Sequence, residues 1–250
     1  MRSVNRTTDP QGEDTAAEVR VARKEALGVA LATSAYGISF GALAVASGFD
    51  VWQTCVLSLV MFTGGSQFAF AGVIGAGGLA AAPAAIASAL LLGVRNVAYG
   101  IRMSPVIGRR ALTRAAAAHF TIDESTAVSL AQRSPGARRV GFWITGIGIY
   151  VGWNLSTLLG ALLGDVLGDP KTYGLDAAAA AAFLALLWPR LRRRQAIAVG
   201  IAAAAVATAL TPVLIPGLPV LVAALVAIAV GWFDWFAPKG VPAAQEEETR

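Results

Sequence analysis

Charged residues are scarce in this chain: Asp, Glu, Lys and Arg make up only 14% of its 250 residues, whereas 56% are hydrophobic. About a quarter of the residues of a soluble domain are charged, so this composition excludes an ordinary soluble domain. It indicates an all-α polytopic membrane protein, because helices satisfy their backbone hydrogen bonds inside the lipid bilayer. The formal net charge of +5 does not indicate nucleic-acid binding, since the basic residues form short clusters between apolar runs.

The chain has one cysteine and one histidine. With Cys55 alone, neither an intramolecular disulfide nor a zinc site of the cysteine type can form. His119 lies in an Arg-rich segment, so Ser66 lacks the neighbouring base that would make it a nucleophile. Phosphate-binding loops, metal-ligand clusters and dinucleotide fingerprints are absent from the sequence as well. We therefore expect no enzymatic activity, no metal and no cofactor.

Acidic residues are missing from the middle of every apolar run, so the sequence shows no embedded carboxylate relay for protons. We expect no cleavable signal peptide, because the first residues lack a short apolar stretch with a small-residue cleavage site. Residues 1–24 and 238–250 are polar and poor in bulky apolar side chains, and we expect both to be tails. Residues 25–237 are then a single transmembrane transport domain.

Seven apolar runs lie between these tails. They span residues 27–46, 51–74, 80–103, 140–163, 175–188, 195–215 and 218–236. A membrane-spanning helix needs about 20 residues, so run 175–188 is short, whereas run 51–74 is long. Gly64 and Gly65 interrupt the long run, and they cost a continuous helix roughly 2 kcal/mol relative to alanine.

Basic residues form three clusters, at residues 20–24, 102–139 and 190–194. The positive-inside rule places all three in the cytoplasm. If the first three apolar runs all crossed the bilayer, the second cluster would face the opposite side from the first. We therefore predict about six crossings and one broken or re-entrant segment at 51–74, with both termini in the cytoplasm.

Gly64, Gly65, Ser66 and Gln67 lie about 20 Å into their run, at a helical rise of about 1.5 Å per residue. A helix that restarts there presents free backbone N–H groups and the positive end of its dipole, which bind carboxylates. Thr63 or Ser66 is expected to cap this restart, and Gln67 adds two donors and an acceptor. An amino-acid substrate suits this chemistry. The alternative is that these small residues only allow helices to pack closely.

Polar and amphipathic residues also lie deep in the third and fourth runs. An arginine at a helix centre costs about 2.5 to 3.5 kcal/mol on insertion scales. Arg95 is about 10 Å along a helix from Arg102, so snorkelling to the cytoplasmic edge and contact with a solute are both open. Asn96 cannot snorkel, and we expect it to hydrogen-bond another helix or the solute. Trp153 and Asn154 are expected to be a packed pair in the core.

Residues 104–139 are predicted to form an Arg-rich cytoplasmic loop. Within it, segment 111–132 has the periodicity of an amphipathic helix and carries both signs of charge. Asp123 and Glu124 lie in this helix, where they are either solvated or positioned to gate a cavity and pair with arginines.

Five separated motifs resemble one known family. They are GGSQFA at 64–69, GVRNVAYG at 93–100, TIDES at 121–125, LLGALLG at 158–164 and GLD at 174–176. In this order and spacing, over roughly residues 23–194, they are similar to the azaleucine-resistance permeases. This AzlC-type family is the large subunit of branched-chain amino-acid exporters. The resemblance implies export of leucine, isoleucine, valine or analogues across the bacterial inner membrane, and a small membrane partner of the AzlD type.

The residue chemistry and the resemblance together predict a site. Substrate is expected at Gly64, Gly65, Ser66, Gln67, Arg95 and Asn96, and gating or coupling at Asp123, Glu124 and Asp176. In an alternating-access mechanism, the broken segment would hold the zwitterion while neighbouring helices rock around it. A passive channel for a small polar solute and a membrane scaffold without flux are the alternatives.

The third run departs from the family pattern at one point. The family often reads Asn-Leu-Arg-His where this chain has Val94, Arg95, Asn96 and Val97. The polar pair is in reversed order and the histidine is missing. If that histidine selects the solute, this chain is expected to move a different solute.

Overall fold

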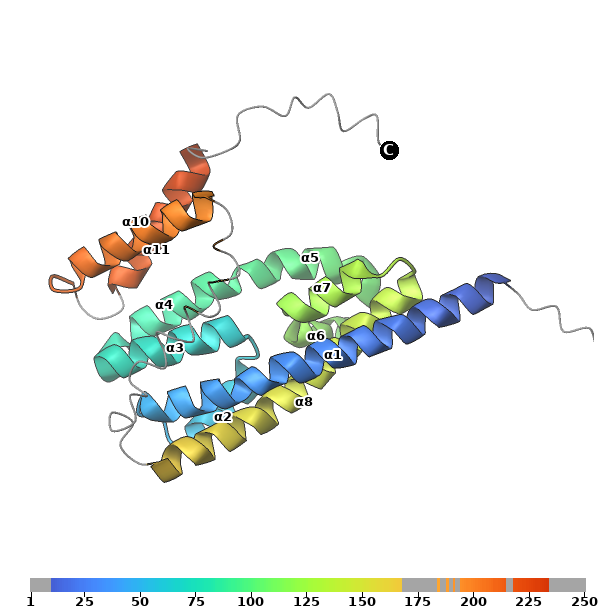
Figure 1. Cartoon of the computed structure of the whole chain (residues 1–250), viewed down its shortest axis with the longest axis horizontal. Coiled ribbons are helices and arrows are strands. Elements are labelled where there is room, and N and C mark those ends of the chain that lie inside the picture. The colour runs from blue at the N-terminus through green and yellow to red at the C-terminus, as the bar shows by residue number, and fades with distance from the viewer. Residues whose placement is uncertain are drawn as a thin grey trace, which may run out of the picture.

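The computed structural model describes residues 10–167, 194–214 and 218–233, and places Leu184, Trp188 and Leu191 singly. All regular secondary structure in these residues is helical, which confirms the predicted all-α class for them (Figure 1). The elements are α1 (Pro10–Ala46), α2 (Val51–Val60), α3 (Gly64–Gly77), the 3-10 turn η1 (Gly78–Ala81), α4 (Ala82–Gly93), α5 (Arg95–Ile107), α6 (Ala111–Phe120), α7 (Asp123–Ala131), α8 (Pro135–Leu167), α10 (Arg194–Leu210) and α11 (Leu218–Phe233).

Three helical stretches of the described residues are long and apolar enough to cross a membrane: Ala16–Ala46, Gly64–Ile107 and Pro135–Val166. Helices α10 and α11 are apolar but shorter. The predicted count of six crossings stays a prediction, because most of run 175–188 lies outside the described residues.

The N-terminal helix is longer than the sequence predicts. A tail is expected over residues 1–24, but α1 already begins at Pro10. Residues 16–24 are mostly alanine, arginine and other good helix formers, and Ala22 is fully buried. The helix therefore continues well ahead of the first apolar run.

Helices α1 and α8 lie side by side and run in the same direction (Figure 1). Near the beginning of the contact, Ala30 lies against Gly148. Near its end, Ala42 lies against Gly164. Because the matching positions rise together along both helices, the basic residues in the first part of α1 (Arg20, Arg23 and Lys24) and those at the start of α8 (Arg138 and Arg139) lie at the same end of the molecule.

The contact between α1 and α8 is one of backbone against backbone. A Cβ atom on Gly37 would lie 2.7 Å from the Trp153 carbonyl oxygen. A Cβ atom on Gly41 would lie 2.6 Å from the Ala161 amide nitrogen. Neither neighbour can move aside, since both belong to the helix backbone. Small residues are the usual means by which membrane helices approach so closely.

Helices α2 and α3 form a hairpin that enters from the C-terminal end of α1 and returns to it. Gly48, with φ +93°, follows α1 and permits the turn, and Asp50 caps α2 with its side chain. The helix stops before Thr63, whose backbone is extended (φ −157°, ψ 102°). Near the end of α3, Gly75 lies against Ser47 beside the end of α1. The hairpin thus begins and ends beside the same end of α1, and its re-entry into the bilayer without crossing stays a prediction.

Helices α6 and α7 form a second hairpin where the sequence predicts one amphipathic helix over 111–132. The helix breaks at Thr121 and Ile122, and both residues are buried. Side chains make this possible, because they satisfy the backbone groups that the break frees. The Thr121 hydroxyl donates to the Ala117 carbonyl at 2.7 Å. The Ile122 N–H donates to the Ser125 hydroxyl oxygen at 3.1 Å.

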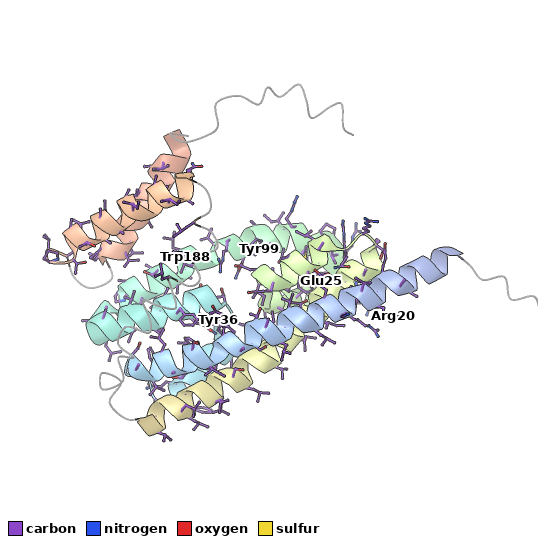
Figure 2. The ribbon with its side chains drawn as sticks, in the orientation of Figure 1. Arg20, Glu25, Tyr36, Tyr99 and Trp188 are labelled. Carbon is purple, nitrogen blue, oxygen red and sulfur yellow. The ribbon has the colours of Figure 1, made fainter. Side chains whose placement is uncertain are left out.

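The second hairpin begins and ends at the N-terminal end of α1 and α8. Gln132, which follows α7, donates from Nε2 to Oε2 of Glu25 at 2.8 Å. Glu25 lies on α1 beside α7 (Figure 2). Arg138, in the first turns of α8, donates from Nε to the Gln132 carbonyl at 2.9 Å. The two hairpins therefore enter the molecule from opposite ends.

The turns of the two hairpins meet in the core. Phe62, in the turn before α3, has its ring centroid 6.4 Å from that of Phe120 at the end of α6. Tyr150 of α8 packs edge-on against both rings, with centroids at 5.0 and 5.5 Å. Ile122 joins the same hydrophobic cluster from the second turn. The middle of segment 104–139 is thus inside the protein.

We predict that Gly41→Ala destabilises the protein strongly, because the added methyl group overlaps the backbone of α8. The loss in free energy of unfolding should exceed the about 1–3 kcal/mol of ordinary overpacking. Gly28→Ala is the control on the same helix, since nothing lies within 4 Å of a Cβ atom there. It should be neutral, or stabilising by up to about 1 kcal/mol. Thermal unfolding of both purified variants in detergent measures the difference. Equal melting temperatures would contradict the close contact between the backbones of α1 and α8.

Candidate functional site

An ion pair lies where the two broken segments restart as helices. Arg95 Nη1, at the start of α5, is 3.1 Å from Asp123 Oδ2, at the start of α7. The same guanidinium lies beside the start of α3, because a Cβ atom on Gly65 would be 3.2 Å from Arg95 Nη2. The side chains of Arg95 and Asp123 are 30% and 29% exposed. The pair is therefore within reach of a solute.

The bend between α4 and α5 sets the position of Arg95. Val94 keeps helical dihedral angles (φ −54°, ψ −34°), so the two helices join at this residue without an extended break. The Ser66 hydroxyl of α3 donates to the Ala89 carbonyl of α4 at 2.8 Å. This bond holds α3 against α4 one turn before the bend. The guanidinium of Arg95 pairs with Asp123. Snorkelling and contact with a solute, the two roles left open for Arg95, both stay predictions.

Two buried atoms near the ion pair have no hydrogen-bond partner within the described part of the chain. They are Nε of Arg95 and Oδ1 of Asn96. A buried polar atom left without a partner costs about 1–3 kcal/mol. One of these atoms is a donor and the other an acceptor, so both are suited to a solute that carries both kinds of group.

Gln67 supports the first break from inside. It is 0% exposed, and its Nε2 donates to the Met61 carbonyl at 2.6 Å and to the Ser58 carbonyl at 3.4 Å. Its Oε1 accepts a hydrogen bond from Trp153 Nε1 at 2.9 Å. Both ends of the amide are thus engaged within the protein. A direct contact of Gln67 with a solute would require these bonds to break.

The start of α3 differs from the prediction in one respect. Thr63 or Ser66 is expected to cap this helix, but Thr63 is the N-cap residue without a side-chain cap hydrogen bond. The Ser66 hydroxyl is directed to α4 instead. The first N–H groups of α3, at Gly64 and Gly65, therefore keep the donor capacity that favours an anion at a helix start.

Trp153 is buried as predicted, at 5% exposure. It stacks on Phe40, with ring centroids 6.4 Å apart, and packs edge-on against Phe68. Asn154, its expected partner in packing, donates instead to the Tyr150 carbonyl of the same helix at 2.7 Å. The bond from the Trp153 indole to the first break is the feature that the sequence does not reveal.

The AzlC protein family matches residues 28–167, which are more than half of the chain. The chain belongs to the AzlC family. The match runs from α1 to the end of α8 and includes both hairpins, Arg95 and Asp123. AzlC membership and the apolar helices make this a membrane protein, and the family implies transport of branched-chain amino acids. No curated protein and no solved structure matches the chain.

Some predicted positions lie apart from this site. Asp176 and the motif at 174–176 are outside the described residues and outside the AzlC match. Glu124 is partly buried in the first turn of α7. Helices α10 and α11 lie beyond the matched segment, where Leu221 packs against the cluster formed by α3 and α4.

We predict that Gln67→Leu and Trp153→Phe are energetically coupled, because each removes one partner of the same buried bond. Each should lower the free energy of unfolding by about 1–3 kcal/mol, and the double variant should lose less than the sum. Trp143→Phe in the same helix is the control, since Trp143 packs on Phe120 and Phe142. In the double variant of Gln67→Leu and Trp143→Phe, the losses in free energy of unfolding should simply add. Chemical denaturation of the three single and two double variants measures both cycles, and additivity of Gln67→Leu and Trp153→Phe would show that the bond carries no stability.

Proposed function

We propose that this AzlC protein is the large subunit of an exporter for branched-chain amino acids, or close analogues, in the bacterial inner membrane. The observation that carries the proposal is the Arg95–Asp123 ion pair, placed where two helical hairpins from opposite ends restart. AzlC proteins generally act with a small AzlD partner. We propose that a subunit of this type completes the exporter.

The ion pair matches the two charges of an amino acid. The solute carboxylate would bind the Arg95 guanidinium and the N–H groups of Gly64 and Gly65 at the start of α3. The solute ammonium would bind the Asp123 carboxylate, with Asn96 Oδ1 as a further acceptor. One internal ion pair is then exchanged for two between protein and solute. The site is electrically neutral whether it is empty or occupied, so binding buries no uncompensated charge.

The apolar side chain of the solute would lie against the hydrophobic residues of the two turns. Phe62 and Phe68 belong to the first hairpin, and Ile122 belongs to the second. All three are buried in the cluster that joins the turns. Aliphatic side chains such as those of leucine and valine suit this surface better than charged ones.

The hairpins supply two gates for alternating access. The α2–α3 hairpin closes the path from the C-terminal end of α1, and the α6–α7 hairpin closes it from the other end. Arg20, Arg23 and Lys24 of α1 and Arg138 and Arg139 of α8 lie at that second end, because the two helices are parallel. The positive-inside rule assigns this end to the cytoplasm. The α6–α7 hairpin is then the cytoplasmic gate, and Asp123 and Glu124 lie on it.

We expect Arg95→Gln to reduce leucine efflux by about 10-fold to 100-fold, because a hydrogen bond to a charged group contributes about 1.5–3 kcal/mol. Arg102→Gln is the matched control, since Arg102 lies on the same helix and is exposed. Efflux of labelled leucine from cells that co-express the chain with an AzlD-type subunit gives the rate. Membrane levels of both variants are measured in parallel. Unchanged efflux in Arg95→Gln, or equal losses in both variants, would refute the assigned role.

The orientation of the gates predicts labelling from opposite sides. Leu79 lies between α3 and α4 and is 86% exposed, and Leu112 lies at the start of α6 and is 85% exposed. In a Cys55→Ser background, a membrane-impermeant maleimide should label Leu79→Cys in intact cells. It should label Leu112→Cys only after the inner membrane has been opened. Labelling of both variants from the same side would exclude opposed hairpins.

A further inference from the structure

The single histidine of the chain lies where the two hairpins touch. His119 is the second-last residue of α6, and its ring packs against three aromatic rings. The ring centroids lie 5.8 Å from Phe62, 5.6 Å from Phe120 and 5.2 Å from Tyr150. These neighbours come from the first turn, the second turn and α8. The imidazole is therefore part of the contact between the two proposed gates.

Imidazole is the side chain that ordinarily gains or loses a proton between pH 5 and 8. The three aromatic ring centroids lie within about 6 Å of the imidazole, and aromatic rings at this range attract a cation. A positive charge on the imidazole would also lie in the last turn of α6, where the carbonyl groups give the helix end a partial negative charge.

Two of the titratable groups around His119 have other partners in the structure. From α8 the facing group is Tyr150, whose hydroxyl donates to the Leu59 carbonyl at 3.3 Å. From the first turn the facing group is Phe62, which is uncharged. Asp123 and Glu124 follow at the start of α7, and Asp123 pairs with Arg95 of α5. The ion pair that is proposed to hold the solute is thus a different contact from the aromatic cluster around His119.

We propose that His119 couples transport to a proton. The contact between His119 and Phe62 joins the two proposed gates. If either hairpin moves to open its gate, the surroundings of the imidazole change. Protonation and gate position must then influence each other, because a group that binds a proton differently in two states shifts the equilibrium between them. One proton taken up by the imidazole from outside and released to the cytoplasm would drive one solute outward. This inference rests on the proposed transport function.

The test uses vesicles that contain the chain together with an AzlD-type subunit. Leucine movement driven by an imposed pH gradient is compared with leucine exchange at equal pH on both sides. The wild type should respond to the gradient. His119→Phe, which keeps a ring in the aromatic cluster, should lose at least about 10-fold of the gradient-driven rate while exchange stays within about twofold. Trp143→Phe, which changes a ring that packs on Phe120 and makes no ring contact with His119 in the described part of the chain, should behave like the wild type.

Three outcomes would overturn the inference, and they are distinguishable. If leucine movement in His119→Phe responds to the pH gradient as strongly as in the wild type, His119 does not couple transport to protons. Leucine flux in the wild type that ignores the gradient would exclude proton coupling and leave transport itself intact. No leucine flux of any kind from the folded wild-type complex would overturn the proposed function and this inference with it. If His119→Phe does not fold, His119→Gln is expected to show the same loss of response and decides the question.

Discussion

The missing Cβ atoms along α1 and α8 are the constraint on which the arrangement of the other helices depends. Gly37 and Gly41 bring the two backbones into contact, and any larger residue would separate the helices. Once α1 and α8 lie parallel at this distance, they present a common wall. The first hairpin is fixed to it by the bond from Trp153 to Gln67. The second hairpin is fixed to it by the contact of Val128 with Gly141.

The two breaks solve the same problem with different residues. A helix that stops inside an apolar environment leaves N–H and carbonyl groups that need partners. At the first break the freed carbonyls accept bonds from Gln67, which itself accepts a bond from Trp153 of α8, and from Tyr150 of α8. At the second break the partners are local, Thr121 and Ser125. The first turn therefore depends on α8 for its shape, whereas the second can form largely on its own.

The sequence reveals one break and conceals the other for a physical reason. Gly64 and Gly65 stand out in an apolar run, so their cost to a helix predicts a break. The second break has no glycine, and the polar pattern of 111–132 is equally typical of a helix on the membrane surface. The available signal is the acidic pair after Ile122, because Asp123 and Glu124 are favoured in the first turn of a helix. Pairings across the fold, such as Trp153 with Gln67 and Arg95 with Asp123, have no local signature at all.

The dependence of the first turn on α8 has a consequence for synthesis. Gln67 and Trp153 are separated by 86 positions, and chains grow at about 5–20 residues per second. The polar turn is therefore made roughly 4 to 17 s before the indole that completes it. During that interval the Leu59 carbonyl oxygen and Gln67 Oε1, whose partners are on α8, would be unpaired and costly in lipid. The nascent first hairpin must accordingly wait in an aqueous or proteinaceous environment, and it enters its final position only when α8 has been delivered.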